Sequence, residues 1–170
     1  MYRVEYVADG YAMIVNESDY RSEWMAQTEA EGEQIAISLN KPEMLSTLAD
    51  VRYQVETAPL ELADGLQILT DRESRAEFWS TYDNLKNELI PDTDWKAANG
   101  WKVVTLAEMH PIAKAMAAHV RGCYAGERQV VTAIKGATTM VQIEAINIAG
   151  QFSQAYQAAV DQMMTAEPDA

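Results

Sequence analysis

The sequence predicts an α+β fold in which short antiparallel β-hairpins pack on helices, followed by a C-terminal antiparallel helical hairpin. Two observations predict this class. Three stretches of β-prone residues each surround an Asp-Gly or Asn-Gly dipeptide, which is the turn chemistry of a hairpin. Two long segments, 109–135 and 138–165, repeat apolar residues in steps of four and three, as two packed helices do.

The composition is that of a globular chain with a strong acidic bias. The 170 residues are 48% hydrophobic and 23% charged, and the formal net charge is −13. Such a charge argues strongly against a nucleic-acid partner, because duplex binding requires a basic surface that neutralises phosphates. The single cysteine excludes a disulfide framework within the chain. We find neither an apolar run of ~18 residues nor a signal-peptide pattern, so we expect a soluble chain with no membrane partner.

Three hairpins are expected, over residues 2–15, 59–69 and 95–106. Each contains a dipeptide that tolerates the positive φ of a type I′ turn, whose twist matches that of an antiparallel hairpin. In chain order these dipeptides are Asp9-Gly10, Asp64-Gly65 and Asn99-Gly100.

Helical patterns fill the intervals in the first half. Tyr20, Trp24 and Gln27 lie about one turn apart and predict a helix over 17–31. The segment 32–39 alternates isoleucine and leucine with other residues, so it is either a strand or a helical extension.

Two further helices should follow. Lys41-Pro42 opens the first, with Asn40 as a possible N-cap, and it should stop before Pro59. Thr70 and Glu73 form a capping box for the second, which Pro91 should end.

The C-terminal half carries the clearest helical patterns. Thr105 and Glu108 form a capping box, but Pro111 predicts a short turn and then a restart of the helix. That helix should close at Lys135-Gly136, where a cation and a glycine suit a helix C-terminus. Thr139 and Gln142 should begin the last helix, and the tight connection makes the pair an antiparallel hairpin.

Three groups of residues are candidates for chemistry. His119, Cys123 and Glu127 recur every fourth residue, so they share a helical face and could bind a metal ion or form a nucleophile–base pair. Cys123 also fits the apolar seam, where a free cysteine acts as a small hydrophobe. Asp92 and Asp94 could hold a divalent cation, but a D-x-D next to proline is common turn chemistry.

Aromatic residues form the third group. Trp95 and Trp101 flank the third turn and could stack on a sugar ring or a base, although such pairs more often pack across strands. The common phosphate, dinucleotide, hydrolase and zinc-protease motifs are missing from the sequence. We therefore predict no catalytic residues, no cofactor, no metal and no enzymatic activity.

The order of features over residues 48–137 carries a family resemblance. The marks are Arg52-Tyr53…Glu56, Gly65, Thr70-Asp71-Arg72-Glu73-Ser74, Trp95-Lys96…Gly100, and Ala118-His119-Val120…Cys123-Tyr124…Glu127. In this stretch the chain resembles an uncharacterised domain family of tailed bacteriophages and prophages, often found in proteins encoded beside tail and tail-fibre genes. The resemblance implies a context and no catalytic residues. It divides the chain into an N-terminal hairpin with an acidic helix (1–40), the tail-associated domain (41–137) and a C-terminal interface helix (138–170).

The expected function is that of a non-enzymatic structural component of a phage particle, in the tail, the baseplate or the fibre attachment. It would be made in the host cytoplasm, be multi-copy or oligomeric, and have other tail, baseplate or fibre proteins as partners. One alternative is a tail-fibre assembly chaperone. Another is an acidic inhibitor of a host defence protein, because residues 1–70 carry a net charge of −9, from thirteen acidic and four basic residues.

The last segment is the predicted interface with a second chain. Residues 138–170 contain no Lys or Arg, and a helix with so few charges is often buried on more than one side. We expect it to pack on the 109–135 helix and on another protein. The predicted contact residues are Ala149, Phe152, Tyr156 and Met163.

Overall fold

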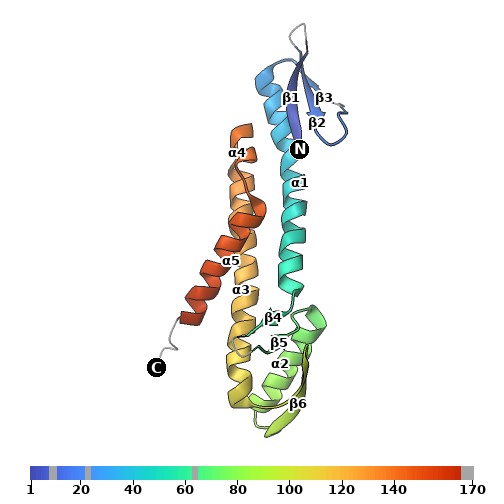
Figure 1. Cartoon of the computed structure of the whole chain (residues 1–170). Coiled ribbons are helices and arrows are strands. Elements are labelled where there is room, and N and C mark those ends of the chain that lie inside the picture. Colours follow the sequence, from blue (N-terminus) through green and yellow to red (C-terminus); the bar gives the residue numbers. More distant parts are fainter. Residues whose placement is uncertain (8–10, 22–23, 63–64, 166–170) are drawn as a thin grey trace. The chain divides into compact units, whose positions relative to one another are not determined.

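The computed structural model describes residues 1–7, 11–21, 24–62 and 65–165 and confirms the α+β class (Figure 1). The elements follow in the order β1 (Tyr2–Val7), β2 (Tyr11–Asn16), β3 (Trp24–Ala26), α1 (Glu29–Thr57), β4 (Leu60–Glu61), β5 (Gln67–Ile68), α2 (Arg72–Lys86), β6 (Asp92–Ala97), β7 (Gly100–Thr105), α3 (Leu106–Gly136), α4 (Met140–Glu144) and α5 (Ile148–Thr165).

The chain forms two compact units. Unit 1 contains residues 1–50 and 127–152, and unit 2 contains residues 51–126 and 153–170. Each unit therefore combines segments that are far apart in the sequence. Within the described ranges, no helix combines the length and the apolar character that crossing a bilayer requires.

Unit 1 contains an antiparallel three-stranded sheet in the order β1-β2-β3. One face of this sheet is buried, and its apolar residues cluster with Ala36 of α1. The buried side chain of Asn40 fixes strand β1 to the helix, since its Oδ1 lies 2.7 Å from the amide of Tyr2 and its Nδ2 lies 2.8 Å from the carbonyl of Tyr2. The first predicted hairpin is confirmed, although its Asp9-Gly10 turn lies outside the described residues.

Two predictions for this region are wrong. The predicted helix over 17–31 is wrong for the described residues before Glu29, because Trp24–Ala26 pairs with β2 as a third strand and α1 begins only at Glu29. The tertiary pairing overrides the helical spacing. No new helix starts at Lys41-Pro42 either, since α1 runs from Glu29 through Pro42 to Thr57. Asn40 is thus a mid-helix residue and not an N-cap. Buried apolar residues on both sides of the proline stabilise the continuous helix; they are Ala36, Ile37, Met44 and Leu48.

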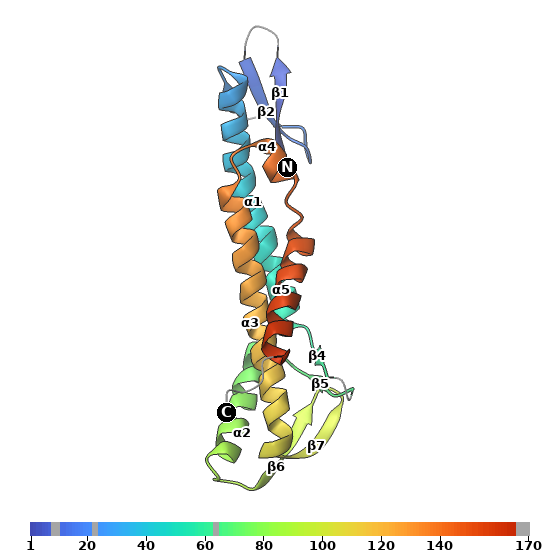
Figure 2. The ribbon, with the colours of Figure 1, turned by 90° about the vertical axis from the view of Figure 1, so that its left-hand side faces the viewer.

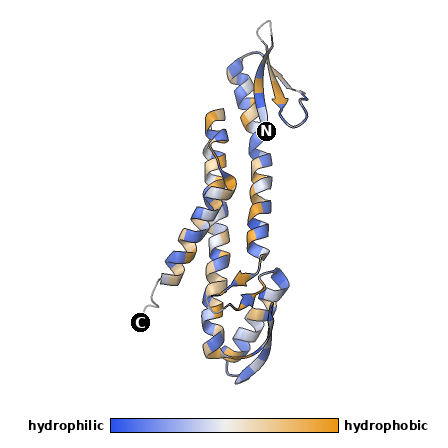
Figure 3. Ribbon diagram, in the orientation of Figure 1, coloured by the Kyte–Doolittle hydropathy of each residue, from blue (hydrophilic) through white to orange (hydrophobic). Residues whose placement is uncertain are grey.

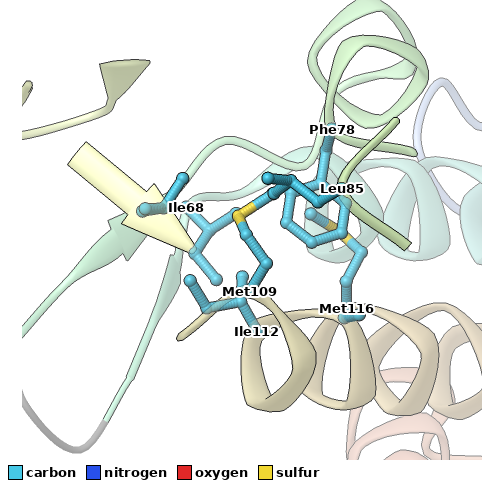
Figure 4. Close-up of a cluster of buried hydrophobic side chains, with 8 residues drawn as sticks. Ile68, Phe78, Leu85, Met109, Ile112 and Met116 are labelled. Carbon is cyan, nitrogen blue, oxygen red and sulfur yellow. The ribbon is translucent and has the colours of Figure 1, made fainter. Parts of the chain in front are cut away.

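Unit 2 is built around a core of α2, α3 and two hairpins (Figure 4). The labelled side chains of Ile68, Phe78, Leu85, Met109, Ile112 and Met116 converge there. All of these are almost fully buried, and burial of such a side chain contributes about 1.5–3 kcal/mol relative to exposure.

Both hairpins predicted for this region are confirmed. Strand β4 pairs antiparallel with β5, and Gly65 in their loop has φ +79°. Figure 2 shows the second pair, β6 and β7, whose register places Ala97 opposite Gly100. Its loop is therefore Ala98-Asn99 rather than Asn99-Gly100. Neither loop residue has positive φ, so the turn is not type I′, and Gly100 (φ +146°) adopts the unusual conformation instead.

Helix α2 has a different N-cap from the predicted one and ends a few residues before Pro91. Asp71, not Thr70, is the N-cap, because its carboxylate accepts hydrogen bonds from the amides of Glu73 and Ser74. Thr70 is buried and donates its hydroxyl hydrogen to the carbonyl of Ala58, at 2.7 Å. The helix ends at Lys86, before Pro91.

Helix α3 is continuous from Leu106 to Gly136, so the predicted restart at Pro111 is wrong. The apolar residues on either side of the proline are buried in one core and stabilise the helix across it. The reciprocal contact predicted at its start is present in part, since Glu108 accepts a hydrogen bond from the amide of Thr105 at 3.0 Å. Hydrophobic and hydrophilic residues alternate along α3 in Figure 3, as expected of a helix with a buried face.

The C-terminal helical hairpin is confirmed, with one interruption. The capping box of Thr139 and Gln142 is present, but it begins the short α4, and α5 starts only at Ile148. Asn147 explains the restart, because its side chain accepts a hydrogen bond from the amide of Gly150 at 3.0 Å, as an N-cap does. A single helix over 138–165 is therefore wrong.

Candidate functional site

Glu56, in the last turn of α1, is the centre of a buried polar network in unit 2. Only 7% of its side chain is exposed, yet it forms ion pairs with Arg52, one turn earlier, and with Arg75 of α2. The Arg75–Glu56 separation is 2.8 Å, and the two arginine side chains are 24% and 20% exposed (Arg52 and Arg75). A carboxylate so deeply buried needs such partners, since an unpaired buried charge is strongly destabilising.

His119 of α3 extends this network to α5. Its Nε2 lies 3.3 Å from the carbonyl oxygen of Glu56, and its Nδ1 lies 2.8 Å from the hydroxyl of Tyr156. A carbonyl oxygen can only accept, so Nε2 carries the proton and Nδ1 accepts the hydrogen of the Tyr156 hydroxyl. Burial lowers the pKa of His119, and the nearby Arg75 adds to this effect, which keeps the imidazole neutral.

Cys123 lies one turn after His119 but does not form a nucleophile–base pair with it. The Sγ–Nε2 distance is 4.0 Å, and Nε2 already donates its proton to Glu56. The thiol is fully buried, and burial, together with the charge of Glu56, raises its pKa to about 11. At neutral pH the sulfur is therefore a protonated thiol and not the thiolate that attacks substrates or binds metals.

The candidate metal ligands do not form a metal site. His119, Cys123 and Glu127 all lie on the continuous helix α3. Asp92 and Asp94 lie on strand β6, paired with Thr105 and Val103 of β7. Among the residues that the structure describes, no group of three or more His, Cys, Asp or Glu side chains is arranged to hold a metal ion.

The four residues of the predicted interface helix differ in their surroundings. Ala149 is exposed, Phe152 is 2% exposed, and Tyr156 and Met163 are half-buried. In unit 2, α5 packs antiparallel on α3, because an added Cβ at Gly122 would lie 2.7 Å from Tyr156, and Lys114 reaches the carbonyl of Met164. The expected contact with the 109–135 helix is thus present. Phe152 offers almost no surface to a second chain, and the contact of this helix with another protein stays a prediction.

Apolar side chains on the outer face of the unit 1 sheet form a different candidate, which the sequence analysis missed. Tyr11 and Met13 of β2 alternate with the buried Ala12 and Ile14, and Met25 of β3 lies directly opposite Met13. Tyr11 is 49% and Met25 is 69% exposed. We call Tyr11, Met13 and Met25 the outer sheet face. The sequence pattern does not predict a strand at Trp24–Ala26, and only the pairing of this strand with β2 brings Met13 and Met25 together.

The family described as Domain of unknown function (DUF4376) matches residues 40–150, about two thirds of the sequence. The chain belongs to the DUF4376 family. No curated protein and no solved structure shows a significant match. The matched range includes Glu56, Arg75, His119 and Cys123, whereas the outer sheet face and most of α5 lie outside it.

Proposed function

We propose that the chain is a non-enzymatic structural component of a tailed bacteriophage particle, in the tail, the baseplate or the fibre attachment. The phage context comes from the sequence resemblance over residues 48–137. The observation that carries the mode of action is the outer sheet face, where Tyr11, Met13 and Met25 present apolar surface to water. Exposed apolar patches with aromatic and Met side chains are typical of protein–protein interfaces.

The buried network of Glu56 supports a structural role over a catalytic one. Its polar groups bind one another, so its chemistry is used to connect α1, α2, α3 and α5 within unit 2. The Cys123 thiol is protonated and not a nucleophilic thiolate, and both ring nitrogens of His119 are already engaged in hydrogen bonds. Such an arrangement stabilises the packing of these helices within unit 2.

The acidity of the first part of the chain adds a constraint on the partner. Residues 1–70 carry a net charge of −9 and include the whole unit 1 sheet. Such an acidic segment favours association with a basic surface of another protein and accelerates the encounter.

Quantitative mass spectrometry of purified particles from cells that encode the chain tests this proposal. We expect the chain to be present in a fixed, integral ratio to the known tail proteins. Presence in the lysate with complete loss from the particles would contradict the proposal and favour the fibre-assembly chaperone. A lysate sample taken before purification is the control for expression.

A further inference from the structure

A groove in unit 2 between α2 and the β6–β7 hairpin is not explained by any role described so far. It has a volume of about 620 Å³, within the usual range of small-molecule sites. Helix α2 contributes Ala76, Glu77, Ser80 and Thr81, and the hairpin contributes Asp94, Trp95, Lys96 and Trp101.

Two tryptophans give the groove flat apolar surfaces. Trp101 is 71% exposed, so it contributes little to the core that the hairpin covers. Trp95 is half-buried, and its ring is held edge-to-face against Phe78, with centroids 5.9 Å apart. One indole is therefore fixed by the core while the other is largely exposed to water, and both line the same groove.

The charged groups of the groove restrict the ligand. Glu77 and Asp94 make it unfavourable for phosphates and other anions. Lys96 lies opposite Trp101 in the strand pair, and its Nζ is 5.8 Å from the centroid of the Trp101 ring. A lysine ammonium group therefore already occupies a position over this ring that a cationic ligand would take. These charged groups favour a neutral ligand over an anion, and Lys96 competes with a cationic ligand for the Trp101 ring.

The polar groups also indicate what that neutral ligand carries. Carboxylates only accept hydrogen bonds, an ammonium group only donates, and the Ser80 and Thr81 hydroxyls do both. A ligand with many hydroxyl groups can satisfy all of them, and the C–H face of a sugar ring can cover an indole. We infer that this groove binds a neutral saccharide. The inference goes beyond the proposed function and does not depend on it.

The four tryptophans of the chain provide a direct test, since each gives one indole N–H signal in a proton–nitrogen NMR spectrum. The probes are neutral pentasaccharides of glucose, galactose, mannose and N-acetylglucosamine, each at about 10 mM so that millimolar affinities are detected. We expect at least one probe to shift the signals of Trp95 and Trp101 while that of Trp24, in unit 1, stays in place.

Two variants separate this site from nonspecific binding. Trp101→Ala should weaken binding about tenfold or more, because it removes the exposed stacking surface. Trp24→Ala, which removes a 46% exposed indole from the other unit, should bind as the wild type does. Asp94→Asn keeps the shape of the groove and should weaken binding less than Trp101→Ala.

Three results would overturn the inference. The first is that none of the four neutral probes shifts Trp95 or Trp101. The second is equal loss of affinity in Trp101→Ala and Trp24→Ala. The third is that a cationic glucosamine pentamer or an acidic sulfated saccharide shifts these signals while the neutral probes do not.

Discussion

Replacing Glu56 by Gln tests the assignment of the buried network most sharply. The substitution keeps the size of the side chain but removes the charge that faces Arg52 and Arg75. The Arg75 contact, at 2.8 Å, is a short charge-assisted hydrogen bond, and such bonds contribute about 1.5–3 kcal/mol each. Removing one partner of a buried ion pair costs about 3–5 kcal/mol because the other charge is left uncompensated.

The two arginines are about one-fifth to one-quarter exposed, so water compensates part of that cost. We therefore expect Glu56→Gln to lower the free energy of unfolding by about 2–4 kcal/mol, measured by urea denaturation. Glu43→Gln, on an exposed position of the same helix, is the matched control and should change stability by less than about 0.5 kcal/mol. A loss below about 1 kcal/mol in Glu56→Gln, with an unchanged denaturant slope, would refute the reasoning.

Three further predictions follow from the contacts of α3. Gly122→Ala should lower the free energy of unfolding by about 1–3 kcal/mol, measured by thermal or urea unfolding, because the added Cβ would lie 2.7 Å from Tyr156 and 2.9 Å from Val160. Gly136→Ala is the control and should be nearly neutral, because there is open space around Gly136. Equal effects of the two variants would contradict the packing of α5 on α3. The pKa of His119 is lowered in the folded chain, so below about pH 6.5 the unfolded chain binds a proton at this residue while the folded chain resists it. The contribution of His119 to stability should therefore be complete above about pH 6.5 and should fall on acidification. His119→Gln should remove this part of the pH dependence. Cys123 should not react with a thiol reagent at neutral pH until the chain unfolds, and rapid labelling of the folded protein would show that the thiol is accessible.

Local turn and cap chemistry predicted much of the fold. The Gly65 and Gly100 hairpins, the Thr139 capping box and the apolar steps of α3 are all short-range signals, and each marks an element that the structure contains. The errors arose where packing outweighs a local signal. Pro42 and Pro111 lie inside continuous helices because buried residues on both sides stabilise them, and Trp24–Ala26 is a strand because β2 pairs with it.

The buried site was harder to predict than the fold. Arg52 and Glu56 are four residues apart on one helix, a spacing that permits an ion pair, but Arg75, His119 and Tyr156 join them only through tertiary structure. The His119–Cys123 spacing was visible in the sequence, yet it could not show that Glu56 engages the imidazole proton. Spacing predicts which side chains share a face, whereas burial and partners determine their chemistry.

Incorporation of surface variants into particles tests the central claim most directly, namely that the outer sheet face binds another component of a phage particle. Met25→Lys places a charge on this face, whereas Val141→Lys places one on a comparably exposed position of the same unit, 74% against 69%. Both variants should fold, because neither side chain is buried. The account predicts that the amount of chain per particle, measured by mass spectrometry, falls about tenfold or more for Met25→Lys and stays at the wild-type level for Val141→Lys. Equal incorporation of the two variants would contradict it.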